Sequence, residues 1–145
     1  MTWLDNAINE YVTFLKSHLK RSDLQNGWFS ITTPFLNMFN DCIEIYCRKD
    51  DDTITLSDGK ETLRNLELFG VNISRSKIKK SILSSILLNY GITLQDGELI
   101  AKTSMKGFGQ TKHNLICCIT EISDMYMLSK PTVASAFIED IDKFF

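Results

Sequence analysis

The chain has 145 residues, of which 43% are apolar and 23% are charged, and its formal net charge at pH 7 is -2. This length and balance fit one globular domain with its own hydrophobic core, and they exclude the disordered and fibrous classes of protein. The small net charge also excludes the broad basic surface that nonspecific DNA binders use. No secretory signal is visible and the apolar runs are too short to span a bilayer, so we expect a cytoplasmic protein.

An amphipathic helix is predicted at the N-terminus. Thr2, with Asp5 three residues later, is typical of the residues that cap the start of a helix. The helical pattern continues as far as Lys20 and Arg21, where we expect the helix to end. Its apolar side chains at helical spacing are Leu4, Ile8, Tyr11, Val12, Leu15 and Leu19.

Three strands are predicted to follow this helix. Residues 28–33 alternate apolar and polar side chains, as a half-buried strand does, and Pro34 breaks the pattern. The acidic segment 49–52 then turns a second strand, 42–48, back into a third strand, 53–56. One face of the second strand carries Ile43, Ile45 and Cys47.

Two helices are predicted after the strands. Asp58 and Glu61 form a capping box for a short helix that Gly70 ends. Ser74 begins a longer helix, which Gly91 terminates. The residues expected on the buried side of the longer helix are Ile78, Ile82, Leu83, Ile86 and Leu87.

The last third of the chain predicts a hairpin and two more helices. Residues 92–95 and 98–103 flank an Asp-Gly pair, the two-residue turn whose positive φ angles match the twist of a hairpin. A helix is predicted over residues 112–127, and Ser129 begins a final amphipathic helix. The apolar stripe of that final helix is Val133, Phe137, Ile141 and Phe144.

The predicted order of elements, α-βββ-αα-ββ-α-α, indicates an α+β fold. Three strands and the later hairpin form an antiparallel sheet, and helices cover one face of it. We expect residues 1–128 to form a single domain and residues 129–145 to form the separate C-terminal helix.

Four segments between residues 28 and 125 carry a family resemblance. They are ITTPFLNMFNDCIEIY, TLSDGKETLRNLELFGVNIS, LLNYGITLQDGELIA and KHNLICCITEISDM. Together they resemble the bacterial and phage family called domain of unknown function 1828. Residues 126–145 resemble the opening of a second family of unknown function, numbered 1829, which commonly follows the first. The resemblance implies either the N-terminal piece of a longer protein or a shorter form without the second region, and it implies no catalytic residues.

One set of residues is compatible with an enzyme. In a nuclease-like arrangement, Asp41 and Asp58 would hold a hydrated Mg²⁺ and Lys60 would stabilise the developing charge. Asp58 is better explained as a helix cap, so the N-terminal module of a metal-dependent nuclease is the second of two alternatives. No other metal site or cofactor is predicted, and the four cysteines, which lack a CxxC spacing, are expected to be free thiols.

The first alternative is a nucleic-acid-binding domain. The short helix, the longer helix and the hairpin have the outline of a winged helix-turn-helix, with the hairpin as the wing. Asp96 and Glu98 at the tip of that wing would repel phosphate groups. The basic residues at the start of the longer helix are Arg75, Lys77, Lys79 and Lys80.

The main hypothesis is a non-enzymatic protein-interaction domain. An acidic surface for a basic protein partner would comprise Asp41, Glu44, Asp50, Asp51 and Asp52. An apolar surface on the last helix, through which we expect a homodimer, would comprise Phe137, Ile141, Phe144 and Phe145. The resemblance to a family of bacteria and phages suggests an inhibitor or adaptor of a host defence protein.

Overall fold

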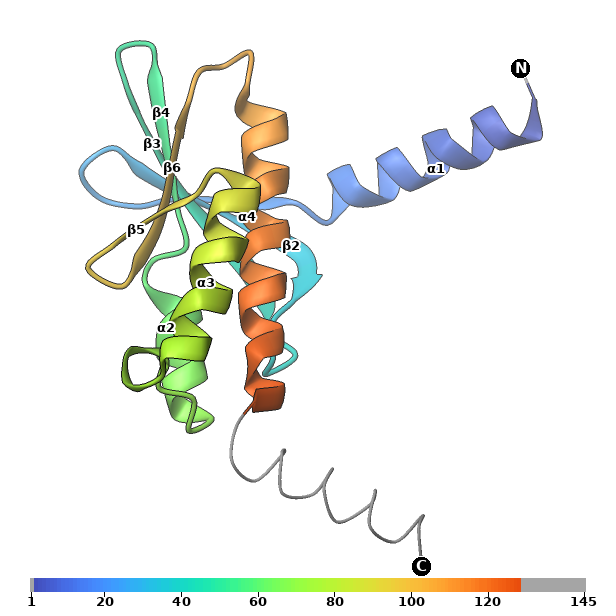
Figure 1. Ribbon diagram of the computed structural model, residues 1–145. Coiled ribbons are helices and arrows are strands. Elements are labelled where there is room, and N and C mark those ends of the chain that lie inside the picture. The colour runs from blue at the N-terminus through green and yellow to red at the C-terminus, as the bar shows by residue number, and fades with distance from the viewer. Residues whose placement is uncertain (1, 129–145) are drawn as a thin grey trace, which may run out of the picture.

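The computed structural model describes residues 2–128 and shows an α+β fold, as the sequence predicts. Six strands form one antiparallel sheet, three helices pack together on one side of it, and the N-terminal helix projects away from the rest (Figure 1). Within the described residues, none of the helices combines the length and the hydropathy that crossing a lipid bilayer requires.

The elements have the following bounds. The helices are α1 (Trp3–Ser17), α2 (Glu61–Leu68), α3 (Lys77–Tyr90) and α4 (Phe108–Ser123), with short 3-10 helices at Ile73–Arg75 and Asp124–Leu128. The strands are β1 (Lys20–Asp23), β2 (Trp28–Leu36), β3 (Cys42–Asp50), β4 (Thr53–Ser57), β5 (Thr93–Gln95) and β6 (Glu98–Thr103). Across the sheet they run in the order β1-β2-β3-β4-β6-β5.

The hydrophobic core lies between the sheet and α4. Ile45 of β3 and Leu56 of β4 are fully buried, as is Leu115 of α4. The helices α2 and α3 both pack against α4, and both α4 and α2 contact strand β6 of the sheet. Burial of apolar side chains at this junction supplies the main driving force for folding.

The predicted helix ends and hairpin turn are confirmed where glycine sets the geometry. Gly70 has a φ of 84° after α2, and the N–H of Val71 donates to the carbonyl of Leu66 at 2.9 Å. This is the bonding pattern of a Schellman cap. Asp96 and Gly97, between β5 and β6, both have positive φ, as the predicted two-residue turn requires.

The predicted end of the first helix is wrong. Helix α1 ends at Ser17, and the Lys20–Asp23 segment forms β1, which pairs with β2. Asn26 and Gly27 both have positive φ and turn the chain between these two strands. In β1, the backbone N–H and C=O groups of residues 20–23 bond to β2 instead of to a preceding turn of helix. This pairing also fixes the direction in which α1 leaves the sheet.

Three further boundaries differ from the prediction. Helix α4 begins at Phe108, before the predicted start at residue 112. Strand β2 continues past Pro34 to Leu36, because a register shift between Thr32 and Leu36 accommodates the proline. Helix α3 begins after Ser76, whose hydroxyl accepts a hydrogen bond from the N–H of Lys79 at 3.2 Å.

The predicted buried side of α3 is only partly buried. Leu83 is buried, and Ile86 and Leu87 are half-buried against the core. In contrast, Ile78 is 74% exposed and Ile82 is 36% exposed. Because α3 packs at the edge of the helical layer, the rest of the protein covers only part of its apolar side.

Candidate functional site

Among the elements that the structure describes, α1 carries the most exposed large apolar side chains. The helix has no buried residue, and Figure 1 shows it leaving the edge of the sheet and extending away from the other helices. Trp3 is 78% exposed and Tyr11 is 58% exposed. We call its exposed large apolar side chains the α1 apolar face: Trp3, Leu4, Ile8, Tyr11, Val12 and Phe14.

Both ends of α1 are well capped. At the start, the hydroxyl of Thr2 accepts a hydrogen bond from the N–H of Asp5 at 3.3 Å, and the Asp5 carboxylate accepts one from the N–H of Thr2 at 3.2 Å. At the end, Nδ1 of His18 lies 2.8 Å from the carbonyl oxygen of Phe14. A 15-residue helix is nevertheless only marginally stable in water, and most helices gain their stability from packing an apolar face. We therefore expect the α1 apolar face to pack against a partner.

The apolar surface continues from α1 onto the body of the domain. A groove of about 440 Å³ lies where the end of α1 meets β2 and α4. Its apolar lining includes Tyr11, Leu15, Leu19, Ile31, Phe35 and Phe108. A partner that covers α1 would therefore also reach this groove.

The structure divides the predicted acidic surface into two parts. Asp41 and Glu44 lie at the start of β3, whereas Asp50, Asp51 and Asp52 lie at its far end. Asp50 lies nine positions after Asp41 along extended chain, a distance of roughly 30 Å. The five residues therefore lie in two separate groups, and a role for either group in binding a basic partner stays a prediction.

The Asp50–Asp52 part is a hairpin turn. Asp50 pairs with Thr53 across the hairpin, and its carboxylate lies 3.3 Å from Nε of Arg48. Asp51 has a φ of 54° and forms the turn with Asp52. All three aspartates are exposed, which fits a solvated turn.

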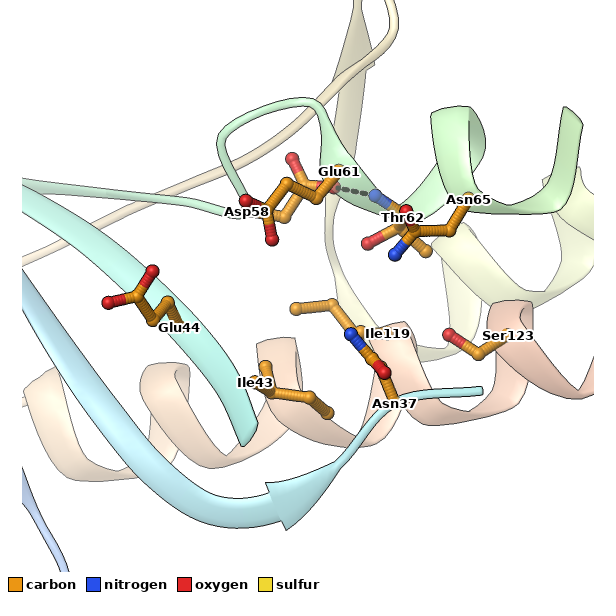
Figure 2. A pocket seen from close by; sticks show the side chains of 9 residues that line it. All are labelled: Asn37, Ile43, Glu44, Asp58, Glu61, Thr62, Asn65, Ile119 and Ser123. Atoms are coloured by element: carbon orange, nitrogen blue, oxygen red, sulfur yellow. Dashed lines mark hydrogen bonds between the residues drawn. The ribbon is translucent and has the colours of Figure 1, made fainter. Parts of the chain in front are cut away.

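In the other part, Glu44 lines a small cavity. Figure 2 shows Glu44, Asp58 and Glu61 around it, and its volume of about 10 Å³ leaves room for about one water molecule. Glu44 accepts hydrogen bonds from Thr32 at 3.1 Å and from the hydroxyl of Tyr46 at 3.2 Å. Within residues 2–128, no group of three His, Cys, Asp or Glu side chains could hold a metal ion.

The pKa values of two groups beside this cavity, Tyr46 and Glu61, are raised. Burial raises the pKa of Tyr46 to about 12, and the negative charges of Glu61 and Glu44 add to the shift. Burial also raises the pKa of Glu61, and the charge of Glu44 is the next largest cause. Because the folded-state pKa of Glu61 lies above its unfolded value, its contribution to stability is present below the unfolded pKa and is lost as pH rises through the folded pKa.

We expect Glu44→Gln to lower the pKa of both Glu61 and Tyr46, because it removes a nearby negative charge. Carboxyl chemical shifts in an NMR titration would report Glu61, and the ultraviolet absorbance of tyrosinate would report Tyr46. The matched control is Asp50→Asn at the other end of β3, which should leave both values unchanged. Equal effects of the two variants would show that long-range charge, and not the cavity, sets the shifts.

Asp58 has a structural position in the loop between β4 and α2. Its side chain is buried, and Oδ1 accepts hydrogen bonds from the N–H groups of Lys60 at 2.9 Å and Leu99 at 3.0 Å. Oδ2 accepts a third from the N–H of Thr62 at 3.1 Å (Figure 2). The predicted capping box with Glu61 is wrong, because α2 begins at Glu61 and Lys60 is the residue before it. With both oxygens of Asp58 bonded to backbone N–H groups, the nuclease alternative gains no support here.

The basic residues of the nucleic-acid alternative lie around the start of α3. Arg75, Lys77 and Lys80 are exposed and Lys79 is half-buried. The neighbouring hairpin is not a free wing, because β6 pairs with β4 as well as with β5. Nucleic-acid binding by these residues stays a prediction.

The predicted C-terminal interface lies outside the part of the chain that the structure describes. Phe137, Ile141, Phe144 and Phe145 lie outside the described residues, as does the whole predicted helix 129–145. Sequence reasoning identified the apolar stripe of α1 but expected it to be part of the helical cover of the sheet. It also left out Trp3 and Phe14, which widen the exposed apolar face.

Comparison with known families confirms part of the resemblance. A family model described as "Domain of unknown function DUF1828" matches residues 33–122, which is more than half of the chain. The matched range runs from β2 to α4, so α1 and β1 lie outside it, as do residues 126–145. A search of curated proteins and a search of solved structures found no match.

Proposed function

We propose that this chain, which belongs to the DUF1828 family, is a non-enzymatic protein-interaction domain that binds its partner through α1. The observation that carries the proposal is the α1 apolar face. Six large apolar side chains lie exposed along one short helix, next to an apolar groove. Contiguous apolar surfaces of this kind mark interaction sites on folded proteins. Since α1 lies outside the range that matches the family model, it adds a binding element to the family's core.

A protein partner fits the chemistry of α1 better than a membrane or a nucleic acid does. The charged residues of the helix are Asp5, Glu10 and Lys16, which gives an excess of negative charge. Helices that lie on anionic membranes are rich in Lys and Arg on the polar face, and nucleic-acid binders neutralise phosphates with the same residues. The aromatic content of the apolar face, in contrast, is typical of the centre of protein interfaces.

For the biological role, we propose an inhibitor or adaptor of a host defence protein, encoded by a phage or mobile element. The sequence resemblance to a family of bacteria and phages supports this role. The genes that flank this one test it, because a position among unrelated housekeeping genes would count against the proposal.

Site-specific photo-crosslinking tests the binding role of α1. With benzoylphenylalanine at position 8, in place of Ile8, we expect covalent adducts with a polypeptide when the full chain is irradiated in its native host. With the same probe in place of Thr13, which is exposed on the polar side of α1, we expect far fewer. Adducts formed only within a single copy of the chain, or adducts with lipid alone, would remove the proposed function.

A further inference from the structure

We infer that the partner of α1 is a second copy of this chain, and that the two α1 helices pair in antiparallel orientation. The inference rests on the proposed function, because it needs α1 to bind a protein. Three features of α1 carry it: the spacing of its apolar residues, the position of its charges and the groove at its base.

The apolar residues of α1 are spaced as in a helix that pairs with another helix. Leu4, Ile8, Tyr11 and Leu15 follow one another at intervals of four, three and four residues. This is the alternation of positions that forms the seam of a coiled coil. These intervals are the same from either end of the helix. When two copies of α1 pair in antiparallel orientation, Leu4 of one therefore lies opposite Leu15 of the other, and Ile8 lies opposite Tyr11. A surface that matches itself in this way is what a two-fold symmetric dimer requires.

The charges select the antiparallel orientation. Asp5 and Lys16 are eleven residues apart, which is about three helical turns, so both lie on the same edge of the apolar face. In an antiparallel pair, the edge that carries Asp5 and Lys16 faces the same edge of the second helix, which runs in the opposite direction. Asp5 of each copy therefore comes near Lys16 of the other copy. In a parallel pair, the edge that carries Asp5 and Lys16 would face the opposite edge of the second helix, so these two charges would not meet. Antiparallel pairing also places the negative end of each helix dipole beside the positive end of its neighbour.

In this arrangement, a residue of the second copy reaches the groove at the base of α1. If Leu4 of the second copy lies opposite Leu15, its Trp3 extends beyond Leu15, to the level of the groove that Leu19 and Phe108 help to line. Trp3 is the most exposed residue of the α1 apolar face, and buried tryptophans in pockets are frequent sources of binding energy. The bodies of the two copies then lie at opposite ends of the helix pair and do not collide.

The size of the helix indicates a reversible dimer. A helix of 15 residues is about 22 Å long. Pairing over that length, with both grooves filled, reaches the roughly 1,000 Å² that specific interfaces need but little more. We therefore expect a dimer dissociation constant on the order of 10 μM.

Analytical ultracentrifugation of the full chain tests the dimer. We expect a monomer–dimer equilibrium, and we expect Ile8→Glu to raise the dissociation constant roughly 100-fold, because each dimer would bury two unpaired carboxylates. Thr13→Glu is the matched control, since it adds the same charge to the polar side and should leave the constant within about threefold. Circular dichroism of both variants would show that the sheet and the other helices remain folded.

Crosslinking between isotopically labelled and unlabelled chains tests the orientation. With benzoylphenylalanine in place of Leu4, we expect intermolecular adducts in the peptide that contains Leu15. Adducts in the peptide that contains Leu4 would overturn the antiparallel orientation.

The remaining outcomes separate the dimer from the proposed function. A monomer at every concentration, with Ile8 crosslinking to a different protein in the host, would overturn the dimer and leave the proposed function intact. A monomer that binds phosphatidylglycerol vesicles through α1, or whose α1 crosslinks only to residues 129–145 of its own chain, would overturn both.

Discussion

Asp58→Ala is expected to lower the free energy of unfolding by about 4 kcal/mol, a large share of the stability of a small domain. The variant removes the acceptor of three backbone N–H groups, those of Lys60, Thr62 and Leu99. Hydrogen bonds to charged groups contribute roughly 1.5–3 kcal/mol each, and buried donors without a partner add a penalty of their own. The bond to Leu99 spans 41 residues of sequence, so its loss also separates the β4–α2 loop from β6. Urea unfolding followed by circular dichroism would measure the change.

Two further variants make this prediction specific. Asp58→Asn keeps one acceptor oxygen and should lose about half as much stability. Asp52→Ala removes an exposed carboxylate from the β3–β4 turn and should change the stability by less than about 0.5 kcal/mol. A chain that tolerates Asp58→Ala as well as it tolerates Asp52→Ala would contradict the structural role. If Asp58→Asn instead folded normally and abolished a Mg²⁺-dependent cleavage activity, the nuclease alternative would regain support.

The sequence predicts the fold class because its strongest signals are local. The Asp-Gly turn at 96–97 and the glycines after α2 and α3 require positive φ, and no neighbouring element competes for these positions. The role of Asp58 could be predicted only in part. Its position before a helix indicated a cap, but the bond to Leu99 depends on β6 lying beside β4, which no local pattern encodes.

The candidate site was harder to predict than the fold. The apolar stripe of α1 looks the same in a sequence whether it packs on the chain's own sheet or on another molecule. What decides between the two is β1, a short polar strand that occupies the edge of the sheet and directs α1 away from it. The turn residues Asn26 and Gly27 were a usable signal for that strand, because both favour positive φ. A hairpin turn at these residues implies a strand before it, and the predicted helix would then end before Lys20.

Gly59→Ala is expected to cost about 3 kcal/mol of stability through two separate effects. Gly59 has a φ of 66°, a conformation that costs an L-residue roughly 1 kcal/mol. A Cβ at this position would also lie 2.5 Å from Cε2 of Tyr46, so the ring must move. That movement weakens the bond from the Tyr46 hydroxyl to Glu44, and overpacking of this kind costs roughly 1–3 kcal/mol. Thermal and urea unfolding would measure the sum.

The two effects can be separated with one control and one double variant. Gly97→Ala lies at a φ of 80° with open space around its Cβ, so it should show the backbone cost alone, about 1 kcal/mol. In a Tyr46→Ser background, Gly59→Ala should cost no more than Gly97→Ala does, because the ring that it would strike is absent. An unchanged cost in that background would mean that the backbone, and not contact with Tyr46, accounts for glycine at position 59. The Tyr46 ring would then be free to adjust, and the cavity beside Glu44 and Glu61 would be less rigid than the hydrogen bonds around it indicate.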